Sequence, residues 1–153
     1  MERIEFTSRS PSDTIAVGAH IGRYAHAGDL FLLFGELGAG KTQLVKGLAK
    51  GLDVADWEYV VSPSFTLLNT YEGRLTLCHV DLYRLEGVDA AQLGIEEYLD
   101  QGVAAVEWAE KASWWGRPLT VTIHVTAEQE RRIVLEVDDV SRAKIWRDFS
   151  SKH

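Results

Sequence analysis

The sequence predicts an α/β fold with a mixed, mostly parallel sheet flanked by helices and carrying an antiparallel hairpin. Three observations lead to this prediction. Leu30 to Phe34 is apolar on both faces, as expected of a central strand that helices cover on both sides. A glycine-rich turn at 35–40 joins this run to a segment whose apolar residues have helical spacing. Farther along, Glu72-Gly73-Arg74 separates two strand-like segments, which is typical of a hairpin.

The elements of the first half follow from local signals. Ile4 and Phe6 alternate with polar residues and predict a short first strand. Ser10-Pro11-Ser12-Asp13 places a capping serine, a proline at the first helical position and an acid in the first turn, so we expect a helix from there to about Ala27. The central strand follows the turn at Gly28-Asp29. A second helix is expected from about Lys41 to Leu52.

The second half is predicted from apolar alternation and from breaks at glycine, proline and charged residues. The expected elements are hairpin strands at 65–71 and 75–80, a short helix from Asp89 to about Leu99 interrupted at Gly94, a buried strand at 103–106, strands at 119–125 and 132–137, and an amphipathic helix at 140–149.

Length and composition indicate one domain over residues 1–153. The chain is 46% hydrophobic and 25% charged, within the usual range for a globular domain. Its longest apolar run, Leu30 to Phe34, is far below the roughly 18 to 20 residues of a membrane span, and the N-terminus lacks a basic-then-apolar signal. We therefore expect a soluble, cytoplasmic protein with no membrane partner.

The net charge and the cysteine content argue against several further kinds of binding site. Sixteen Lys and Arg against 23 Asp and Glu give a net charge of −7, which argues against direct, tight binding to a nucleic-acid backbone. The single cysteine, Cys78, excludes an intramolecular disulfide and a multi-thiolate zinc site. A bound metal would therefore need oxygen or imidazole ligands, and a hard cation such as Mg²⁺ fits.

One motif carries the chemistry. Residues 35–42 match G-x-x-x-x-G-K-[ST] at every fixed position, between a predicted strand and a predicted helix. Glycines let the backbone N–H groups turn toward a phosphate, and the helix N-terminus adds its partial positive charge. Lys41 can reach the β- and γ-phosphates of a nucleotide, and the Thr42 hydroxyl can bind magnesium. The motif therefore predicts a phosphate-binding loop.

Acids at strand ends are the candidates for a second magnesium anchor, because ligands of open α/β sheets bind at the carboxyl ends of the strands. Asp81 follows the segment 75–80, and Glu107 follows 103–106. Each could hold the ion directly or through water, or orient the attacking water. Thr66, after Ser62-Pro63-Ser64-Phe65, could approach the γ-phosphate as part of a switch loop.

Other conspicuous side chains have structural explanations. His79 is expected to be a hydrogen-bonded core histidine rather than a metal ligand, since no second imidazole lies at ligand spacing. Trp108 could border the nucleotide or a partner, or pack in the core, and Trp114-Trp115 could form a contact patch or cover a core edge. Arg84 could stabilise phosphate charge or form an ion pair.

Taken together, these segments resemble the TsaE family (also called YjeE), the small bacterial ATPases of tRNA threonylcarbamoyladenosine biosynthesis. The resemblance rests on five motifs in the family's order and spacing: G-E-L-G-A-G-K-T at 35–42, S-P-S-F-T-L at 62–67, H-V-D-L-Y-R at 79–84, L-G-I-E-E-Y-L at 93–99 and V-E-W-A-E at 106–110. Two departures are Ser64, where the family usually has threonine, and residues 89–92, which lack the usual acidic pair.

The resemblance implies a P-loop NTPase fold and magnesium-dependent ATP hydrolysis, slow without partners. It also implies service to a complex of TsaD and TsaB, which modifies the adenosine beside the anticodon, with tRNA met only indirectly. Its site residues would be the phosphate lysine Lys41, the magnesium ligands Thr42 and Glu107, the essential acid Asp81, the switch threonine Thr66, the aromatic Trp108, the loop residues Glu36, Leu37, Gly38, Ala39 and Gly40, and Ser10 or Thr14 near the adenine.

Two other functions stay open on the residues alone. A small-molecule kinase uses the same loop, although such kinases generally need an acceptor-binding insertion and an arginine-bearing lid, for which little chain remains after Glu110. In a nucleotide-gated binding module, ATP occupancy would set the affinity for a partner and hydrolysis would be incidental. A regulatory GTPase fits less well, because the chain has no N-K-x-D segment.

Overall fold

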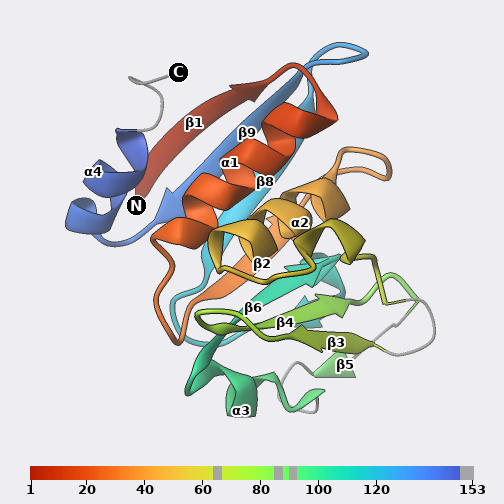
Figure 1. The fold of residues 1–153 in the computed structure, drawn as a ribbon, viewed down its shortest axis with the longest axis vertical. Helices are drawn as coiled ribbons and strands as arrows, with labels where there is room; N and C mark the ends of the chain where they lie inside the picture. The colour runs from red at the N-terminus through yellow and green to blue at the C-terminus, as the bar shows by residue number, and fades with distance from the viewer. Residues whose placement is uncertain (64–66, 85–87, 90–92, 149–153) are drawn as a thin grey trace.

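A computed structural model describes residues 1–63, 67–84, 88–89 and 93–148 (Figure 1). Its main sheet has seven strands in the order β1-β9-β8-β2-β6-β4-β3. The helices and strands are β1 (Glu2–Ser8), α1 (Pro11–Arg23), β2 (Leu30–Phe34), α2 (Lys41–Gly51), β3 (Leu68–Tyr71), β4 (Thr76–Asp81), β5 (Val88–Asp89), α3 (Ile95–Leu99), β6 (Gly102–Glu107), β7 (Ala112–Ser113), β8 (Leu119–Val125), β9 (Arg131–Val137) and α4 (Val140–Arg147), with short 3₁₀ turns at Trp57–Tyr59 and Ala109–Lys111.

The sheet is mixed and mostly parallel, as predicted. The four neighbouring strands β8, β2, β6 and β4 are parallel, whereas β9 and β3 run in the opposite direction and β1 pairs with the outer edge of β9. The strand β2 lies between two parallel neighbours, which confirms that Leu30–Phe34 is central. The hairpin is also confirmed, because β3 and β4 pair antiparallel with Tyr71 opposite Leu77.

The hydrophobic core lies on both faces of the sheet. Phe31 and Leu33 of β2 belong to the larger cluster, which includes residues of α1 and α2. Leu30 and Leu32 belong to a smaller cluster on the opposite face, with Ile95 of α3. This alternation is what a doubly covered strand requires. In the described part of the chain, no helix is long and apolar enough to span a membrane.

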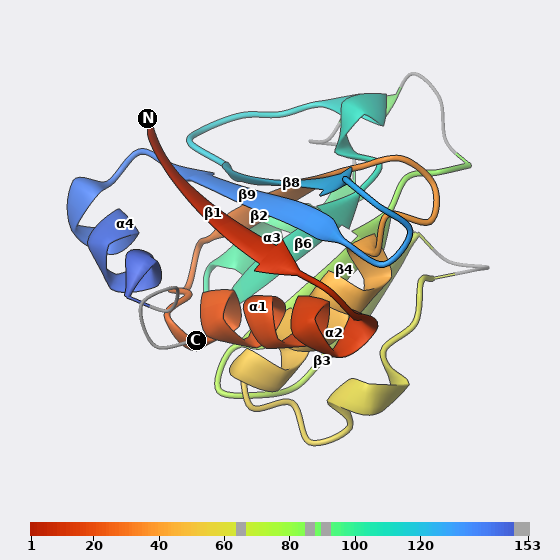
Figure 2. The same cartoon turned by 90° about the horizontal axis from the view of Figure 1, so that it is seen from above.

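The helices α1 and α2 lie side by side on one face of the sheet (Figure 2). Their contact depends on small residues: a Cβ atom on Gly47 would lie 2.2 Å from the Ile15 carbonyl oxygen, and one on Gly18 would lie 2.4 Å from that of Leu44. Because a heavier side chain cannot fit there, the glycines fix the spacing of the two helices. This packing sets the start of α2 close to the start of α1.

Some predicted boundaries are wrong. The helix α1 ends at Arg23 rather than near Ala27, because the next residues form a turn in which the His26 N–H donates to Asp29 Oδ2 at 2.7 Å. Of the helix predicted from Asp89 to about Leu99, the structure shows α3 at Ile95–Leu99, after a left-handed backbone at Gly94 (φ +71°). Its predicted first residue, Asp89, pairs in β5 instead, and residues 90–92 lie outside the described part. The last helix is confirmed from Val140 to Arg147, and residues 149–153 lie outside the described part.

Candidate functional site

The loop between β2 and α2 has the backbone that anion binding requires. Gly38 and Gly40 both have positive φ angles, +83° and +110°, a backbone conformation that residues with a side chain rarely adopt. In this part of the described chain, no side chain caps the N-terminus of α2 and no acid lies in its first turn. The helix α1 differs, since Ser10 accepts from the Asp13 N–H. The first N–H groups of α2 are therefore available to an anion.

Lys41 is held at the edge of this loop by two contacts. Its Nζ donates to the Gly35 carbonyl oxygen at 2.6 Å and lies 3.5 Å from the centre of the Trp108 ring. The residue is only 5% exposed, and burial lowers the pKa of its ammonium below the ordinary value. The carboxylates of Glu107, Glu110 and Asp81 oppose this shift. Lys41 thus supplies a partly desolvated positive charge beside the loop.

A cluster of oxygen atoms lies at the start of α2. The Thr42 hydroxyl oxygen is 3.2 Å from both carboxylate oxygens of Glu107 and 2.9 Å from the hydroxyl oxygen of Ser62. Ser62 itself lies 3.4 Å from Glu107 Oε2. Glu107 is the last residue of β6 and is only 3% exposed. Strand β6 and helix α2 therefore bring together two of the predicted magnesium ligands.

Asp81 ends the neighbouring strand and is in register with Glu107. Its Oδ1 accepts the Tyr83 N–H at 2.9 Å. Burial raises the pKa of the Asp81 carboxyl above its ordinary value, and the nearby Glu107 raises it further, while the bond from Tyr83 and the side chains of His79 and Ser62 oppose the change. Two acids thus meet at the carboxyl ends of adjacent parallel strands, as predicted.

These donors suit a hard cation. Hydroxyl and carboxylate oxygens are the ligands that Mg²⁺ prefers, and it usually binds to one or two carboxylates together with phosphates and water. Within the described residues, no group of three or more His, Cys, Asp or Glu side chains could hold a metal ion. An ion bound by Thr42 and Glu107 would therefore need further oxygen ligands from a nucleotide and from water.

Two cavities are lined by residues of the loop. The larger, about 380 Å³, is lined by Lys41, Thr42 and both acids, and the smaller, about 130 Å³, lies toward the start of α1. Gly38, Gly40 and Gln43 line both. A ligand that extends from one cavity to the other would cross the loop, which is the arrangement a nucleotide needs.

Most predicted site residues line one of these cavities. The larger has Leu37, Gly38, Gly40, Lys41, Thr42, Asp81, Glu107 and Trp108, and the smaller has Ser10, Thr14, Gly38, Ala39 and Gly40. The hydroxyls of Ser10 and Thr14 already form hydrogen bonds, to Asp13 and to Ser8. Glu36 is exposed and lines neither cavity. Thr66 lies outside the described residues.

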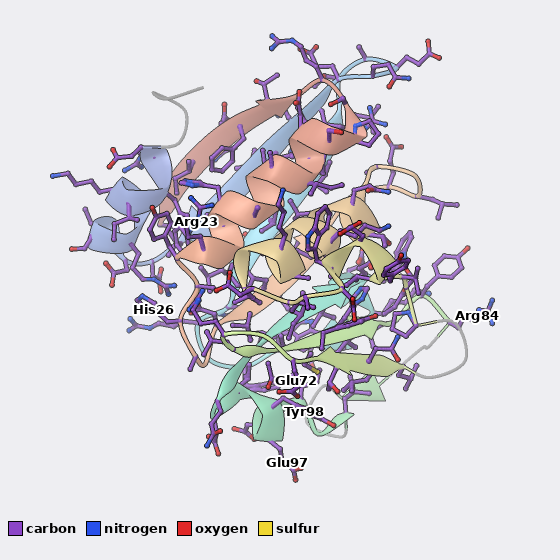
Figure 3. All side chains as sticks on the ribbon, in the orientation of Figure 1. Arg23, His26, Glu72, Arg84, Glu97 and Tyr98 are labelled. Carbon is purple, nitrogen blue, oxygen red and sulfur yellow. The ribbon has the colours of Figure 1, made fainter. Side chains whose placement is uncertain are left out.

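The remaining conspicuous residues lie elsewhere. Arg84 is exposed and points outward from the fold (Figure 3). Trp114 and Trp115 stack with ring centres 5.9 Å apart and pack against the smaller core cluster. The two tryptophans therefore cover an edge of the core, one of the two alternatives considered for them.

Sequence reasoning overlooked several side chains of the site. Ser62, Gln43 and Tyr83 line the larger cavity, and Gln129 and Arg131 line the smaller one. Gln129 and Arg131 lie in the β8–β9 turn or at its end, so no local motif could connect them to the loop.

His79 is buried, as expected, but the expectation that its hydrogen bonds are satisfied is wrong in part. Its Nε2 lies 2.6 Å from Glu107 Oε2, whereas Nδ1 has no partner among the described residues. Its position two residues before Asp81 on a strand was the available signal, since alternation places both on one face.

Comparison with known proteins gives a consistent result. The family model described as threonylcarbamoyl adenosine biosynthesis protein TsaE matches residues 8–134. Proteins named tRNA threonylcarbamoyladenosine biosynthesis protein TsaE are similar to this chain: that of Nostoc sp. is 47% identical over 64% of this chain and 63% of its own length, and that of Treponema pallidum is 43% identical over 84% and 96%. The match therefore spans just under two thirds of the Nostoc protein.

A solved structure agrees with this fold. The crystal structure of Bacillus subtilis YdiB superposes with a TM-score of 0.73 at 29% identity, over 99% of this chain and 96% of that one. The P-loop NTPase fold expected from the sequence is thus confirmed.

Proposed function

Since this chain belongs to the TsaE family of tRNA threonylcarbamoyladenosine biosynthesis proteins, we propose that it is a magnesium-dependent ATPase of that biosynthesis, acting as a single domain on a complex of TsaD and TsaB in the cytoplasm. One observation carries the proposal: Lys41, Thr42, Asp81 and Glu107 line a single cavity beside an uncapped helix N-terminus. Nucleotide triphosphates fit this arrangement because their charge is concentrated on the phosphates.

Each residue has a distinct task in ATP hydrolysis. The N–H groups at 38–42 bind the phosphates, and Lys41 leaves the Trp108 ring to neutralise charge on the β- and γ-phosphates. Thr42 and Glu107 would hold magnesium, which supplies charge neutralisation at the phosphate oxygens when bound. The 3.2 Å separation of their oxygen atoms supports this pairing.

Asp81 is proposed to act beside these ligands. Its carboxylate lies next to Glu107 in the sheet and lines the same cavity, so it can anchor the ion, directly or through water, or orient the attacking water. Burial and the neighbouring Glu107 raise the pKa of Asp81, which makes its carboxylate a better proton acceptor than an exposed one. Orienting the attacking water and accepting its proton both make Asp81 more important for turnover than for nucleotide affinity.

The route to tRNA is proposed to be indirect. A chain with a net charge of −7 is repelled by a phosphate backbone and has few cations whose contacts would release counterions. TsaD and TsaB would therefore make the contact with tRNA, and nucleotide occupancy of this chain would change its affinity for them. A nucleotide-gated binding module remains the second candidate, favoured by the contact of Lys41 with Trp108, which a bound phosphate would disrupt.

ATP hydrolysis by three variants tests the proposal. Lys41→Ala should abolish turnover, and Glu107→Gln should raise the magnesium concentration required. Asp81→Asn should lower kcat by more than it changes nucleotide affinity. Lys50→Ala is the matched control, because this exposed lysine lies on the same helix and lines neither cavity. Turnover by Lys41→Ala equal to that of Lys50→Ala would contradict the ATPase assignment, and tight nucleotide binding without any turnover would favour the gated module.

A further inference from the structure

His79 is a fully buried polar residue that the proposed mechanism does not use. It lies in β4, in register with Ala105 of β6, and the next pair along these strands on the same face is Asp81 with Glu107. Leu77 and Ala105, on this face, belong to the larger core cluster. The imidazole extends along the sheet toward Glu107, with Nε2 2.6 Å from Oε2.

The bond between the two residues has a defined direction. Because a carboxylate only accepts, the proton between them is donated by His79 Nε2, at 2.6 Å from Glu107 Oε2. Both oxygens of this carboxylate, Oε1 and Oε2, lie 3.2 Å from the Thr42 hydroxyl oxygen. The bond from His79 therefore restricts rotation of the carboxyl group and holds it beside Thr42 at the start of α2.

A purely structural role explains this residue poorly. Nδ1 of His79 is buried and has no hydrogen-bond partner in the part of the chain that the structure describes. A buried polar atom without a partner is unfavourable, and an apolar side chain of similar size would avoid that cost in this core layer. What the imidazole contributes here is its bond to Glu107.

We propose that His79 is a positioning residue, which holds Glu107 in the orientation that binds magnesium together with Thr42. This inference rests on the proposed function, because it assumes that Glu107 is a metal ligand. Hydrogen-bond partners of metal ligands fix ligand orientation, and their loss typically weakens metal binding by about 10- to 100-fold. His79 does not touch the ion or the nucleotide in this account.

Two substitutions separate the hydrogen bond from side-chain packing. His79→Leu removes the hydrogen-bond donor and fills its place in the core with an apolar side chain. His79→Gln keeps an N–H donor at a reach similar to that of Nε2. The readout is binding of a fluorescent ATP analogue, titrated with Mg²⁺ and repeated in EDTA, with thermal unfolding as the measure of folding.

His79→Leu should weaken apparent Mg²⁺ affinity about 10- to 100-fold, leave analogue binding in EDTA unchanged, and cause no further loss in a Glu107→Gln background. His79→Gln should remain within a few-fold of wild type. If His79→Leu does not fold, His79→Asn replaces it, because its shorter amide cannot reach Glu107. Wild-type Mg²⁺ affinity in the folded Leu or Asn variant, or equal losses in the Gln and Leu variants, would overturn the inference.

The same titration separates this inference from the proposed function. If wild type shows no Mg²⁺-dependent binding, or if Glu107→Gln binds Mg²⁺ normally, the assignment of Glu107 as a ligand fails. If Glu107→Gln is defective while folded His79→Leu is normal, only the role of His79 fails.

Discussion

The Lys41 ammonium lies 3.5 Å from the centre of the Trp108 ring, although Lys41 belongs to the motif at 35–42 and Trp108 to the motif at 106–110. The ring face attracts the cation, and the ammonium donates a hydrogen bond to the Gly35 carbonyl oxygen at 2.6 Å. A nucleotide phosphate must compete with both contacts for the same ammonium. The charge state of Lys41 is therefore expected to control nucleotide affinity.

Nucleotide affinity should fall as the pH rises toward the pKa of Lys41. Only the protonated amine neutralises phosphate, and burial lowers its pKa from the ordinary 10.5, so the loss should begin at a lower pH than for an exposed lysine. Equilibrium binding of an ATP analogue between pH 7 and about 10 measures this effect. The Lys41→Arg variant, which stays charged, should lack the fall, and an identical pH profile in that variant would contradict the explanation.

Gly47→Ala should destabilise the protein. An added Cβ atom would lie 2.2 Å from the Ile15 carbonyl oxygen, so α1 and α2 would have to separate. Overpacking of this kind costs about 1–3 kcal/mol, whereas alanine in place of a solvent-exposed helical glycine gains about 0.5–1 kcal/mol. Urea denaturation gives the sign directly. A more stable variant would show that the helices can move apart freely.

The ion pair between Arg142 and Asp29 should contribute substantially to stability. The guanidinium donates to both carboxylate oxygens, at 2.9 and 2.6 Å, and joins α4 to the start of β2. Arg142→Ala would leave a nearly buried carboxylate without its partner and should cost about 2–4 kcal/mol in unfolding free energy. Arg117→Ala is the control, because its pair with Asp138 is exposed and should contribute less than about 1 kcal/mol. Equal losses in the two variants would refute this difference.

Cys78 should be unreactive in the folded protein. Burial raises the pKa of its thiol to about 12, so almost no thiolate exists near pH 8. In the native protein, a thiol-specific reagent should modify Cys78 only as fast as the chain unfolds. In denaturant, the same reagent should modify Cys78 quickly. Since the unfolded thiol ionises near its ordinary pKa of 9.0, wild type should also lose stability relative to Cys78→Ala between pH 9 and about 12. Rapid labelling of the native chain would contradict this burial.

How much the sequence could predict depended on the range of the interactions. The central strand β2 and the loop at 35–42 were predictable, because burial on both faces and the glycine spacing are local patterns. The end of α1 was not, because it depends on a turn bond from His26 to Asp29 rather than on helix propensity.

Contacts between distant residues explain the other omissions. His79 and Glu107 are 28 residues apart, and only the parallel pairing of β4 with β6 reveals that they meet. Trp146 of α4 is fully buried, and its Nε1 donates to the Ile21 carbonyl oxygen of α1, a contact that the periodicity of α4 alone could not indicate. Contacts like these depend on how strands and helices are arranged in space, which local periodicity in the sequence does not specify.

The most direct test of the central claim is formation of threonylcarbamoyladenosine on tRNA by a reconstituted TsaD–TsaB system supplied with this chain. Wild type should support repeated modification, and Lys41→Ala, confirmed as folded by its thermal unfolding, should support none, since the proposed coupling needs the lysine at the phosphates. The exposed-lysine variant Lys50→Ala should equal wild type. Full modification with Lys41→Ala would contradict an energy-coupling role for the nucleotide site.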